Sequence, residues 1–381
     1  MNIKDIFNKD LTLNWDVIND IPEIKALKGC HQHTQWHQEG DAYVHTEMVT
    51  KEIDDIIKYS YIEKDRDIIL LRAAALLHDI GKPAATKWDD KEQQWITHDH
   101  GKAGENIVRR LFFNDDDINL REQICYMVRN HMALHYIKDE SEKSKKRLIK
   151  LSYGPVNLYL MYLLNMADTK GSRSVFKTEE RFTEHCELIE KLLRELDCVY
   201  EPYKFDSRID KLCELNKINI NKHDVINGKE STIYIMCGIP GSGKSTYIKD
   251  KLGDINIVSR DIIRYQLGYS SSPDEKIIGS KEQEKRVTEV SDEMMIKFCE
   301  ENVDFVIDNM NIKYDYRRYI LEKVIKYNKR IVIIYVEPPT IYDAITCRNQ
   351  YISPENYDKI IDGMMFPMPY EADEVILYKR K

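Results

Sequence analysis

The chain has 381 residues, of which 42% are hydrophobic and 32% are charged, and its formal net charge is −8. This length supports two domains with separate cores, and the negative charge argues against a protein that wraps nucleic acid over its whole surface. The eight cysteines form no C-x-x-C pair, which argues against a disulfide framework or a zinc ribbon. No apolar signal region opens the chain and no run approaches about 18 apolar residues, so we expect a cytoplasmic protein without a membrane partner.

The first half of the chain carries a helical pattern nearly throughout residues 41–200. Apolar residues recur at spacings of three and four, which predicts one buried face per helix. Glycine and proline interrupt the pattern at the joins. We therefore predict an all-α domain over residues 1–205. The expected helices lie within 45–61, 68–81, 118–132, 155–168 and 182–200.

The second half has a different pattern. Residues 206–230 are polar and lose the periodicity, so we predict a linker there. Beyond it, short β-branched runs alternate with helical patterns, which predicts an α/β domain with a parallel sheet over residues 231–381. The expected strands are 231–237, 255–259, 303–308 and 330–337.

Residues 238–246 read GIPGSGKST and match the phosphate-binding pattern G-x-x-x-x-G-K-[ST] in full. A strand is expected before this loop and a helix after it, which is the context that the pattern requires. The backbone N–H groups of such a loop surround phosphate oxygens. We expect Lys244 to neutralise the β- and γ-phosphates of ATP and Ser245 to hold Mg²⁺. The other expected ATP contacts are Gly238, Gly241, Ser242, Gly243 and Thr246.

A kinase also needs a base for the acceptor hydroxyl. The stretch VSRDIIRYQLG places Asp261 just after a strand and Arg264 three residues later. Asp261 is suited to accept the hydroxyl proton, and Arg264 to hold an anionic part of the acceptor. A helix-capping aspartate followed by a solvated arginine is the alternative, and the pattern alone favours it.

The phosphate-binding loop, the SRD segment with its following arginine, VIDNMN and CRNQ together resemble the P-loop polynucleotide 5′-kinase family. The resemblance covers residues 231–381. It implies that Asp261 is the general base and that Arg264 contacts the acceptor phosphate. It also implies that Asp308, at the end of a strand, helps to place the acceptor.

The same resemblance implies a lid arginine at Arg348 that clamps the γ-phosphate. Several relatives carry a second lid arginine a few residues later, where this chain has QYI. Two possibilities therefore stay open: Arg348 acts alone, or Arg317 and Arg318 contribute.

Histidines and carboxylates recur in the first half, on or beside the expected helices. Taken singly, each is more often a hydrogen-bonded core residue or a helix cap than a ligand. Four of them on separate helices are able to converge at the centre of a bundle, as metal sites in helical folds do. Such a set accepts Mn, Co, Ni, Fe, Zn or Mg, which activate water and clamp phosphate groups. The four residues are His45, His78, Asp79 and Asp168.

The order H…HD…D, with the stretches HQEGDAYVHT, HDIGKP and HGKAG, resembles the HD phosphohydrolase superfamily over residues 35–175. The likeness is greatest to the HD domains of tRNA nucleotidyltransferases. It implies one or two divalent metals, the second held by His100 and His131, although His98 and His135 compete for these roles. It also implies that Lys82 lies near the scissile phosphate.

The two halves together resemble fusions of an HD phosphohydrolase with a polynucleotide kinase, which are end-healing enzymes of RNA repair. The resemblance implies transfer of the ATP γ-phosphate to a 5′-hydroxyl of RNA or DNA. It also implies hydrolysis of 2′,3′-cyclic phosphate or 2′/3′-monophosphate ends, upstream of a separate RNA ligase. A small-molecule or nucleoside kinase fused to an HD nucleotide hydrolase stays open as an alternative, as does a regulatory protein that senses a nucleotide or an RNA end.

Overall fold

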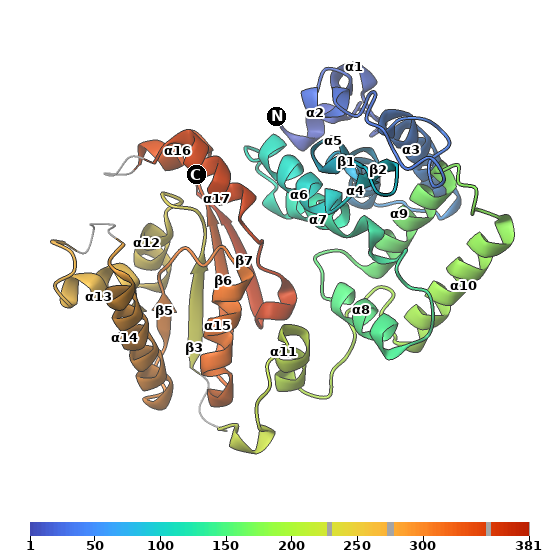
Figure 1. The fold of residues 1–381 in the computed structure, drawn as a ribbon. Helices are drawn as coiled ribbons and strands as arrows, with labels where there is room; N and C mark the ends of the chain where they lie inside the picture. Colours follow the sequence, from blue (N-terminus) through green and yellow to red (C-terminus); the bar gives the residue numbers. More distant parts are fainter. Residues whose placement is uncertain (227–230, 273–277, 348–351, 381) are drawn as a thin grey trace. The chain divides into compact units, whose positions relative to one another are not determined.

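A computed structural model describes the chain in four stretches, which are residues 1–226, 231–272, 278–347 and 352–380. The chain divides into two compact units, residues 1–204 and residues 205–381 (Figure 1). The segment expected to be a linker contains helix α11 (Arg208–Asn216), which belongs to the second unit. Arg208 forms an ion pair with Asp373, and the amide of Asn216 donates to the carbonyl of Tyr370 at 2.8 Å. The helix has only nine residues and buries only Leu212, Cys213 and Leu215 as apolar side chains, which is too short an apolar pattern to stand out in the sequence.

Helices form most of the first unit, and each of the five expected ranges holds one. The helices are α3 (Ala42–Tyr59), α4 (Asp65–Leu77), α7 (Ile118–Asn130), α9 (Leu158–Gly171) and α10 (Glu179–Glu195). Helix α4 is central, because it packs against α3, α7 and α9. Its apolar run from Leu70 to Leu77 is almost wholly buried, so it fixes the residues that follow it in the middle of the unit.

Several elements of this unit were not expected. Two longer helices are α6 (His100–Leu111) and α8 (Glu142–Ser152), and the shorter ones are α1 (Trp15–Ile18), α2 (Pro22–Lys25) and α5 (Lys82–Ala85). The unit also contains a hairpin of strands β1 (Thr86–Asp89) and β2 (Gln94–Thr97), in which Trp88 lies opposite Trp95. Strands of four residues are too short to show a clear alternation in the sequence.

The second unit is built on a five-stranded parallel sheet with the order β4-β5-β3-β6-β7. Its strands are β3 (Thr232–Cys237), β4 (Asn256–Val258), β5 (Phe305–Ile307), β6 (Arg330–Glu337) and β7 (Glu374–Lys379). The four expected strands are confirmed, and β7 is an additional edge strand. The phosphate-binding loop follows β3, so it lies at the carboxyl edge of the sheet, where parallel α/β folds bind ligands.

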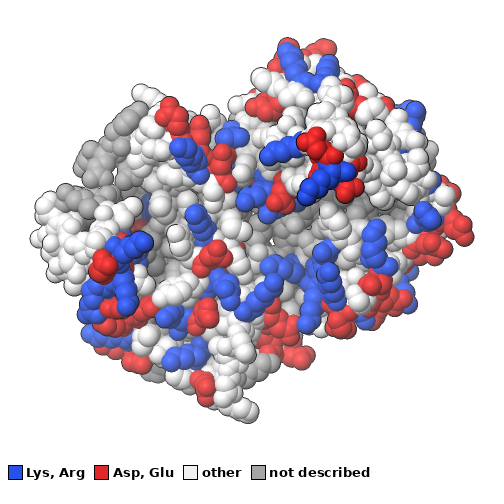
Figure 2. Space-filling model, in the orientation of Figure 1, with Lys and Arg blue, Asp and Glu red and all other residues white. Residues whose placement is uncertain are grey.

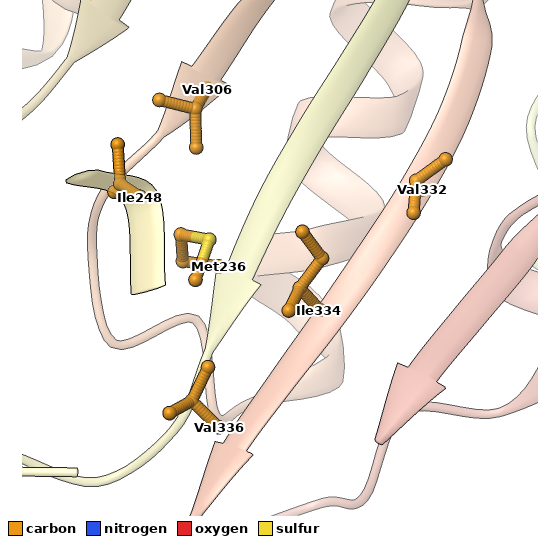
Figure 3. Close-up of a cluster of buried hydrophobic side chains, with 6 residues drawn as sticks. All are labelled: Met236, Ile248, Val306, Val332, Ile334 and Val336. Atoms are coloured by element: carbon orange, nitrogen blue, oxygen red, sulfur yellow. The ribbon is translucent and has the colours of Figure 1, made fainter. Parts of the chain in front are cut away.

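Buried aliphatic side chains hold the phosphate-binding loop against this sheet. Met236 of β3, Val306 of β5 and Ile334 of β6 cluster with Ile248, which follows the loop (Figure 3). Burying each such side chain stabilises the fold by roughly 1.5–3 kcal/mol. The other helices of the unit are α12 (Lys244–Tyr247), α13 (Arg260–Gln266), α14 (Lys281–Glu300), α15 (Tyr314–Val324), α16 (Ile341–Thr346) and α17 (Pro354–Asp362). Among the described residues, no helix has the length and apolar character needed to cross a bilayer.

Candidate metal centre and phosphate-transfer site

Three packed helices bring four of the predicted metal ligands together. His45 lies in the first turn of α3 and Asp168 in the last turn of α9. His78 and Asp79 directly follow α4. His45 Nε2 lies 3.0 Å from Asp168 Oδ1 and 3.2 Å from His78 Nε2, and His78 Nε2 lies 3.2 Å from Asp79 Oδ2. All four side chains are buried.

The other two predicted ligands of this cluster lie near Oδ1 of Asp79, whereas His78 lies near Oδ2. His100 opens α6, and His131 opens the short turn His131–Ala133 after α7. Their Nε2 atoms lie 3.3 Å and 3.8 Å from Asp79 Oδ1 and 3.0 Å from each other. Asp79 therefore joins two ligand groups, and its two oxygens face different groups.

The hydrogen bonds of the histidines test whether this cluster fits metal ions. His78 Nδ1 lies 2.8 Å from the carbonyl of Ala75, and His131 Nδ1 lies 2.8 Å from the carbonyl of Val128. A carbonyl only accepts, so both rings donate from Nδ1, and in the neutral form their Nε2 lone pairs face the cluster. Each of these Nε2 atoms lies within 3.2 Å of another imidazole nitrogen. Buried imidazole lone pairs that face one another with carboxylates beside them are a donor set that would hold divalent cations, so the residues fit one or two metals.

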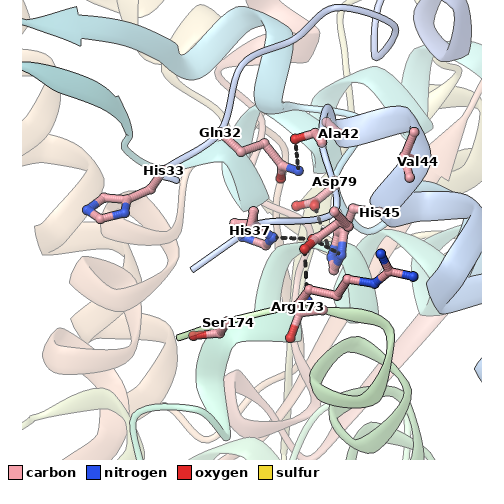
Figure 4. A network of polar contacts seen from close by, with 12 residues as sticks. Gln32, His33, His37, Ala42, Val44, His45, Asp79, Arg173 and Ser174 are labelled. Atoms are coloured by element: carbon pink, nitrogen blue, oxygen red, sulfur yellow. Dashed lines mark hydrogen bonds and ion pairs between the residues drawn. The ribbon is translucent and has the colours of Figure 1, made fainter. Parts of the chain in front are cut away.

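Glu39 is a residue of the site that the sequence reasoning missed. Figure 4 labels its three partners, His37, His45 and Arg173. Its Oε1 lies 2.7 Å from His37 Nδ1 and 3.0 Å from His45 Nδ1, and its Oε2 accepts the backbone N–H of Arg173 at 2.8 Å. Burial opposes ionisation of Glu39, but the hydrogen bonds from His37 and His45 lower the pKa of its carboxyl group. A carboxylate on Nδ1 orients the His45 ring and directs Nε2 to the metal position. The only signal in the sequence is the acidic residue two positions after His37.

Lys82 is buried in the same network. Its Nζ lies 2.7 Å from Asp79 Oδ2 and also contacts the side chain of Gln32, another residue that was not anticipated. Burial alone would raise the pKa of Asp79, but His78 and Lys82 hold it well below its usual range. The cluster therefore contains a carboxylate that stays ionised and a fixed cation beside it.

His98 and His135 were the alternatives to His100 and His131 as metal ligands, and neither of the two lies against Asp79 in the way that His100 does. His135 Nε2 lies 3.0 Å from Asp168 Oδ2, so it touches the cluster through the oxygen that His45 does not use. His98 is exposed at the end of the hairpin, one residue from Asp99, which precedes α6. The structure thus places His100 and His131, rather than this pair, against Asp79.

In the second unit, the phosphate-binding loop adopts the conformation that its glycines permit. Gly241 and Gly243 have φ values of +77° and +97°, which side chains with a Cβ rarely adopt. Lys244 Nζ donates to the carbonyls of Gly238 and Ile239, at 3.0 Å each. The predicted loop residues therefore lie together around one end of β3, and Thr246 is exposed in the helix that follows.

Asp308 lies next to this loop. The hydroxyl of Ser245 donates to Asp308 Oδ2 at 3.0 Å, across a separation of 63 residues in the chain. A loop serine and a carboxylate after a neighbouring strand are the groups that hold Mg²⁺ in P-loop enzymes. The position of Asp308 thus fits a metal role beside Ser245, and the acceptor-placing role that the resemblance implied stays a prediction.

Asp261 and Arg264 lie together at the start of α13. Asp261 is the second residue of the helix and Ser259 occupies the capping position, so the cap interpretation of Asp261 is wrong. Arg264 is only 8% exposed, so it is not a solvated arginine. Its guanidinium donates to Asp261 at 2.7 Å and to both oxygens of Glu284 at 2.8 Å. Arg264 therefore fixes the Asp261 carboxylate in place.

The arginines considered for the lid differ in their surroundings. Arg317 is buried, forms an ion pair with Glu371 at 2.7 Å and donates to a backbone carbonyl. Arg318 donates to the carbonyl of Asn216 at 2.8 Å. Both side chains have structural partners, so their proposed share in the phosphate clamp is not supported. Arg348 lies outside the described residues.

Arg380 is a further cation that the sequence reasoning missed. It follows β7, and its Cδ lies 3.1 Å from the position that a Cβ on Gly243 would occupy. Its guanidinium donates to the thiol sulfur of Cys347 at 3.2 Å. The carboxyl ends of parallel strands share one edge, so a residue just after the last strand is a general candidate for this edge.

Comparisons with known proteins agree with this division. Residues 43–163 match the model of the HD domain, and residues 233–349 match the model of an AAA domain. The Multifunctional CCA protein of Psychromonas ingrahamii is 33% identical over 119 residues, which is 30% of this chain and 25% of that protein. The Multifunctional CCA protein of Vibrio cholerae serotype O1 is 34% identical over 156 residues, which is 40% of this chain and 35% of that protein.

The chain thus spans only a quarter to about a third of the length of these relatives. The HD half of the chain resembles the HD domains of CCA tRNA nucleotidyltransferases. The chain combines a helical HD domain with a kinase-like P-loop domain on a five-stranded parallel sheet.

Proposed function

We propose that the protein heals the ends of nucleic acids, with RNA as the favoured substrate. It does so by two separate phosphate chemistries. The observation that carries the proposal is the presence in one chain of a cluster suited to phosphoester hydrolysis and a loop suited to phosphate donation. Cleavage by many ribonucleases leaves a 2′,3′-cyclic phosphate and a 5′-hydroxyl. A ligase requires the opposite arrangement, so removal at one end and addition at the other form a coherent pair.

The HD site supplies the hydrolytic half of the proposal. Divalent metals, when bound, polarise water and the phosphate oxygens. His45, His78 and Asp168 would hold one metal, His100 and His131 the other, and Asp79 would contact both. Lys82 lies 2.7 Å from the Asp79 carboxylate, so its charge favours a phosphate at this position. In the first step, water adds to phosphorus and the bond to one ribose oxygen breaks, which leaves a hydroxyl and a phosphate monoester. In the second step, another water adds to phosphorus, the remaining ribose oxygen leaves as a hydroxyl, and inorganic phosphate is released.

The P-loop site supplies the phosphorylating half. When ATP binds, the side chain of Lys244 exchanges the loop carbonyls for the phosphates of ATP. Ser245 and Asp308 would hold Mg²⁺ beside these phosphates. Asp261, fixed by Arg264, accepts the proton of the 5′-hydroxyl while the γ-phosphoryl group passes to its oxygen and ADP leaves. The charge of the Asp261 carboxylate is stabilised by the guanidinium at 2.7 Å.

One observation favours a second candidate, a kinase for a small hydroxyl compound fused to an HD nucleotide hydrolase. Arg264 is bound by two carboxylates, so it has little capacity left to grip a nucleic-acid phosphate. If this arrangement persists during catalysis, the acceptor does not need to be a polynucleotide. The two candidates differ in acceptor length, because only a polynucleotide kinase prefers an oligonucleotide to a nucleoside.

The proposal is tested with an RNA oligonucleotide that carries a 5′-hydroxyl and a 2′,3′-cyclic phosphate. It is incubated with ATP, Mg²⁺ and a series of divalent metals, and both ends are read by mass spectrometry. Gain of a 5′-phosphate and loss of the cyclic phosphate are the expected results. Change at neither end would refute the nucleic-acid assignment, and faster phosphorylation of a nucleoside than of the oligonucleotide would support the second candidate.

A further inference from the structure

Two groups of aromatic side chains on the surface of the HD unit are linked to residues of the metal cluster through one or two intervening residues. The Trp36–Phe176 pair has ring centroids 4.6 Å apart, and its members are 52% and 39% exposed. In the second group, His31 stacks on Trp95 at 4.8 Å, and Trp95 meets Trp88 edge-on at 5.6 Å. Large exposed aromatic rings next to a buried polar site commonly mark a binding surface.

The Trp36–Phe176 pair is joined to the cluster through His37. His37 follows Trp36, bonds to Glu39 and packs its ring edge-on against that of His45, with centroids 4.8 Å apart. Two backbone hydrogen bonds tie this segment to the one that carries Phe176: Val175 N to Gln35 O at 3.0 Å, and Gln38 N to Arg173 O at 2.6 Å. The pair therefore has a fixed position next to the side chains that orient His45.

The group of His31, Trp95 and Trp88 is joined to the cluster by a different route. His31 precedes Gln32, whose side chain contacts Lys82, and Lys82 contacts the bridging Asp79. Strand β1 of the hairpin directly follows α5, which begins at Lys82. Trp88 is 45% exposed, so this group also presents a ring to solvent.

The charge distribution makes stacking more important for binding a nucleic acid. On the face shown in Figure 2, basic and acidic side chains are interspersed within each unit. The whole chain has a net charge of −8. On this face, mixed charges give a polyanion no uniformly basic surface, so local contacts contribute more to holding a strand there. Base–aromatic stacking provides roughly 1–3 kcal/mol per base and tolerates any sequence.

We propose that the Trp36–Phe176 pair and the group of His31, Trp95 and Trp88 stack the unpaired bases next to the phosphate that enters the HD site. The occupant is the single-stranded 3′ end of a nucleic acid. This inference rests on the proposed function and specifies which part of the substrate the HD unit holds. It predicts that the HD site prefers an oligonucleotide end to a small phosphoester because of stacking and not because of chemistry at phosphorus.

The test measures metal-loaded full-length protein with two substrates: an octanucleotide with a 3′-phosphate and p-nitrophenyl phosphate. We expect Trp36→Leu and Trp88→Leu each to raise KM for the octanucleotide roughly tenfold. Leucine keeps apolar packing but lacks a ring, and Trp36→Phe, which keeps a ring, should restore most of the affinity. The rate with p-nitrophenyl phosphate should stay within twofold of wild type for all three variants.

Tyr59→Leu is the matched control, because Tyr59 is 72% exposed on α3 but lies 14 residues after His45, about 20 Å along the helix. Equal loss on both substrates in the Trp36→Leu variant would mean that the ring only holds the loop in place. Unchanged KM for the octanucleotide in both leucine variants would overturn the stacking proposal while end hydrolysis stood. Hydrolysis of p-nitrophenyl phosphate but not of the octanucleotide by the wild type would overturn the proposed function itself.

Discussion

The two phosphate sites are built in opposite ways. The P-loop site is concentrated in nine consecutive residues, 238–246, and backbone groups form most of it. The HD cluster takes its side chains from positions as far apart as His45 and Asp168. A contiguous loop needs only the correct conformation of its own backbone, whereas the cluster needs several helices packed in register. The HD site should therefore be the more sensitive to changes in residues that do not touch substrate.

The largest expected effect comes from one substitution in each site, which should abolish one activity and leave the other intact. Lys244→Ala should lower the phosphorylation of a 5′-hydroxyl oligonucleotide by about 10³-fold or more, because the charge on the transferred phosphate is no longer balanced. Asp79→Asn should do the same to hydrolysis at the 3′ end, because the bridging charge is lost. Each variant should keep the other activity near the wild-type rate. Loss of both activities in a variant with an unchanged circular dichroism spectrum would contradict two independent sites.

Asp261→Asn should reduce the kinase rate by about 10²- to 10⁴-fold, since the amide cannot accept the hydroxyl proton. The effect should appear in kcat rather than in KM for ATP, because the proposed base acts on the acceptor hydroxyl and not on the nucleotide. Steady-state kinetics with both substrates varied measures the two constants. An effect confined to KM for ATP would remove Asp261 from the role of base.

Glu39→Gln tests whether the HD site is sensitive to a residue that does not itself touch substrate. The amide cannot accept from both His37 and His45 with the strength of a carboxylate, so we expect metal affinity to fall by about 10- to 100-fold. Calorimetric titration with Mn²⁺ measures this directly, without an assay of turnover. Glu47→Gln on α3, the helix that carries His45, changes the charge by the same amount at a residue with no predicted role and is the control.

Arg380→Ala should have the smallest effect, a rise of roughly threefold to tenfold in KM for ATP from the loss of one half-buried cation beside the loop. Arg330→Ala, which removes an exposed arginine at the start of β6, should leave KM for ATP unchanged. Hydrolysis at the HD site should not respond to either change. An unaltered KM in the Arg380 variant would mean that the arginine only contacts Cys347.

The contrast between a contiguous loop and a cluster assembled from distant residues also explains which elements the sequence predicted well. The periodicity of α3, α4, α7, α9 and α10 and four of the five strands in the sheet were apparent, because long elements repeat their pattern many times. The hairpin, α6, α8, α11 and β7 were not predicted. The hairpin strands, α11 and β7 are short or edge elements that depend on contacts with distant residues, whereas α6 and α8 are helices of 12 and 11 residues that the sequence reasoning missed. Arg208, for example, lies in the segment that was expected to be a linker and pairs with Asp373.

The sequence by itself determined the phosphate-binding loop, because one backbone conformation and a few glycines carry its chemistry. It also identified the histidines and aspartates of the HD cluster as a set. Only the tertiary structure decided that His100 and His131, and not His98 and His135, face Asp79. Only the tertiary structure brought Glu39 to His45 and Asp308 to Ser245. The reason is that a side chain acquires such a partner through helix packing and strand order, which no local stretch of sequence encodes.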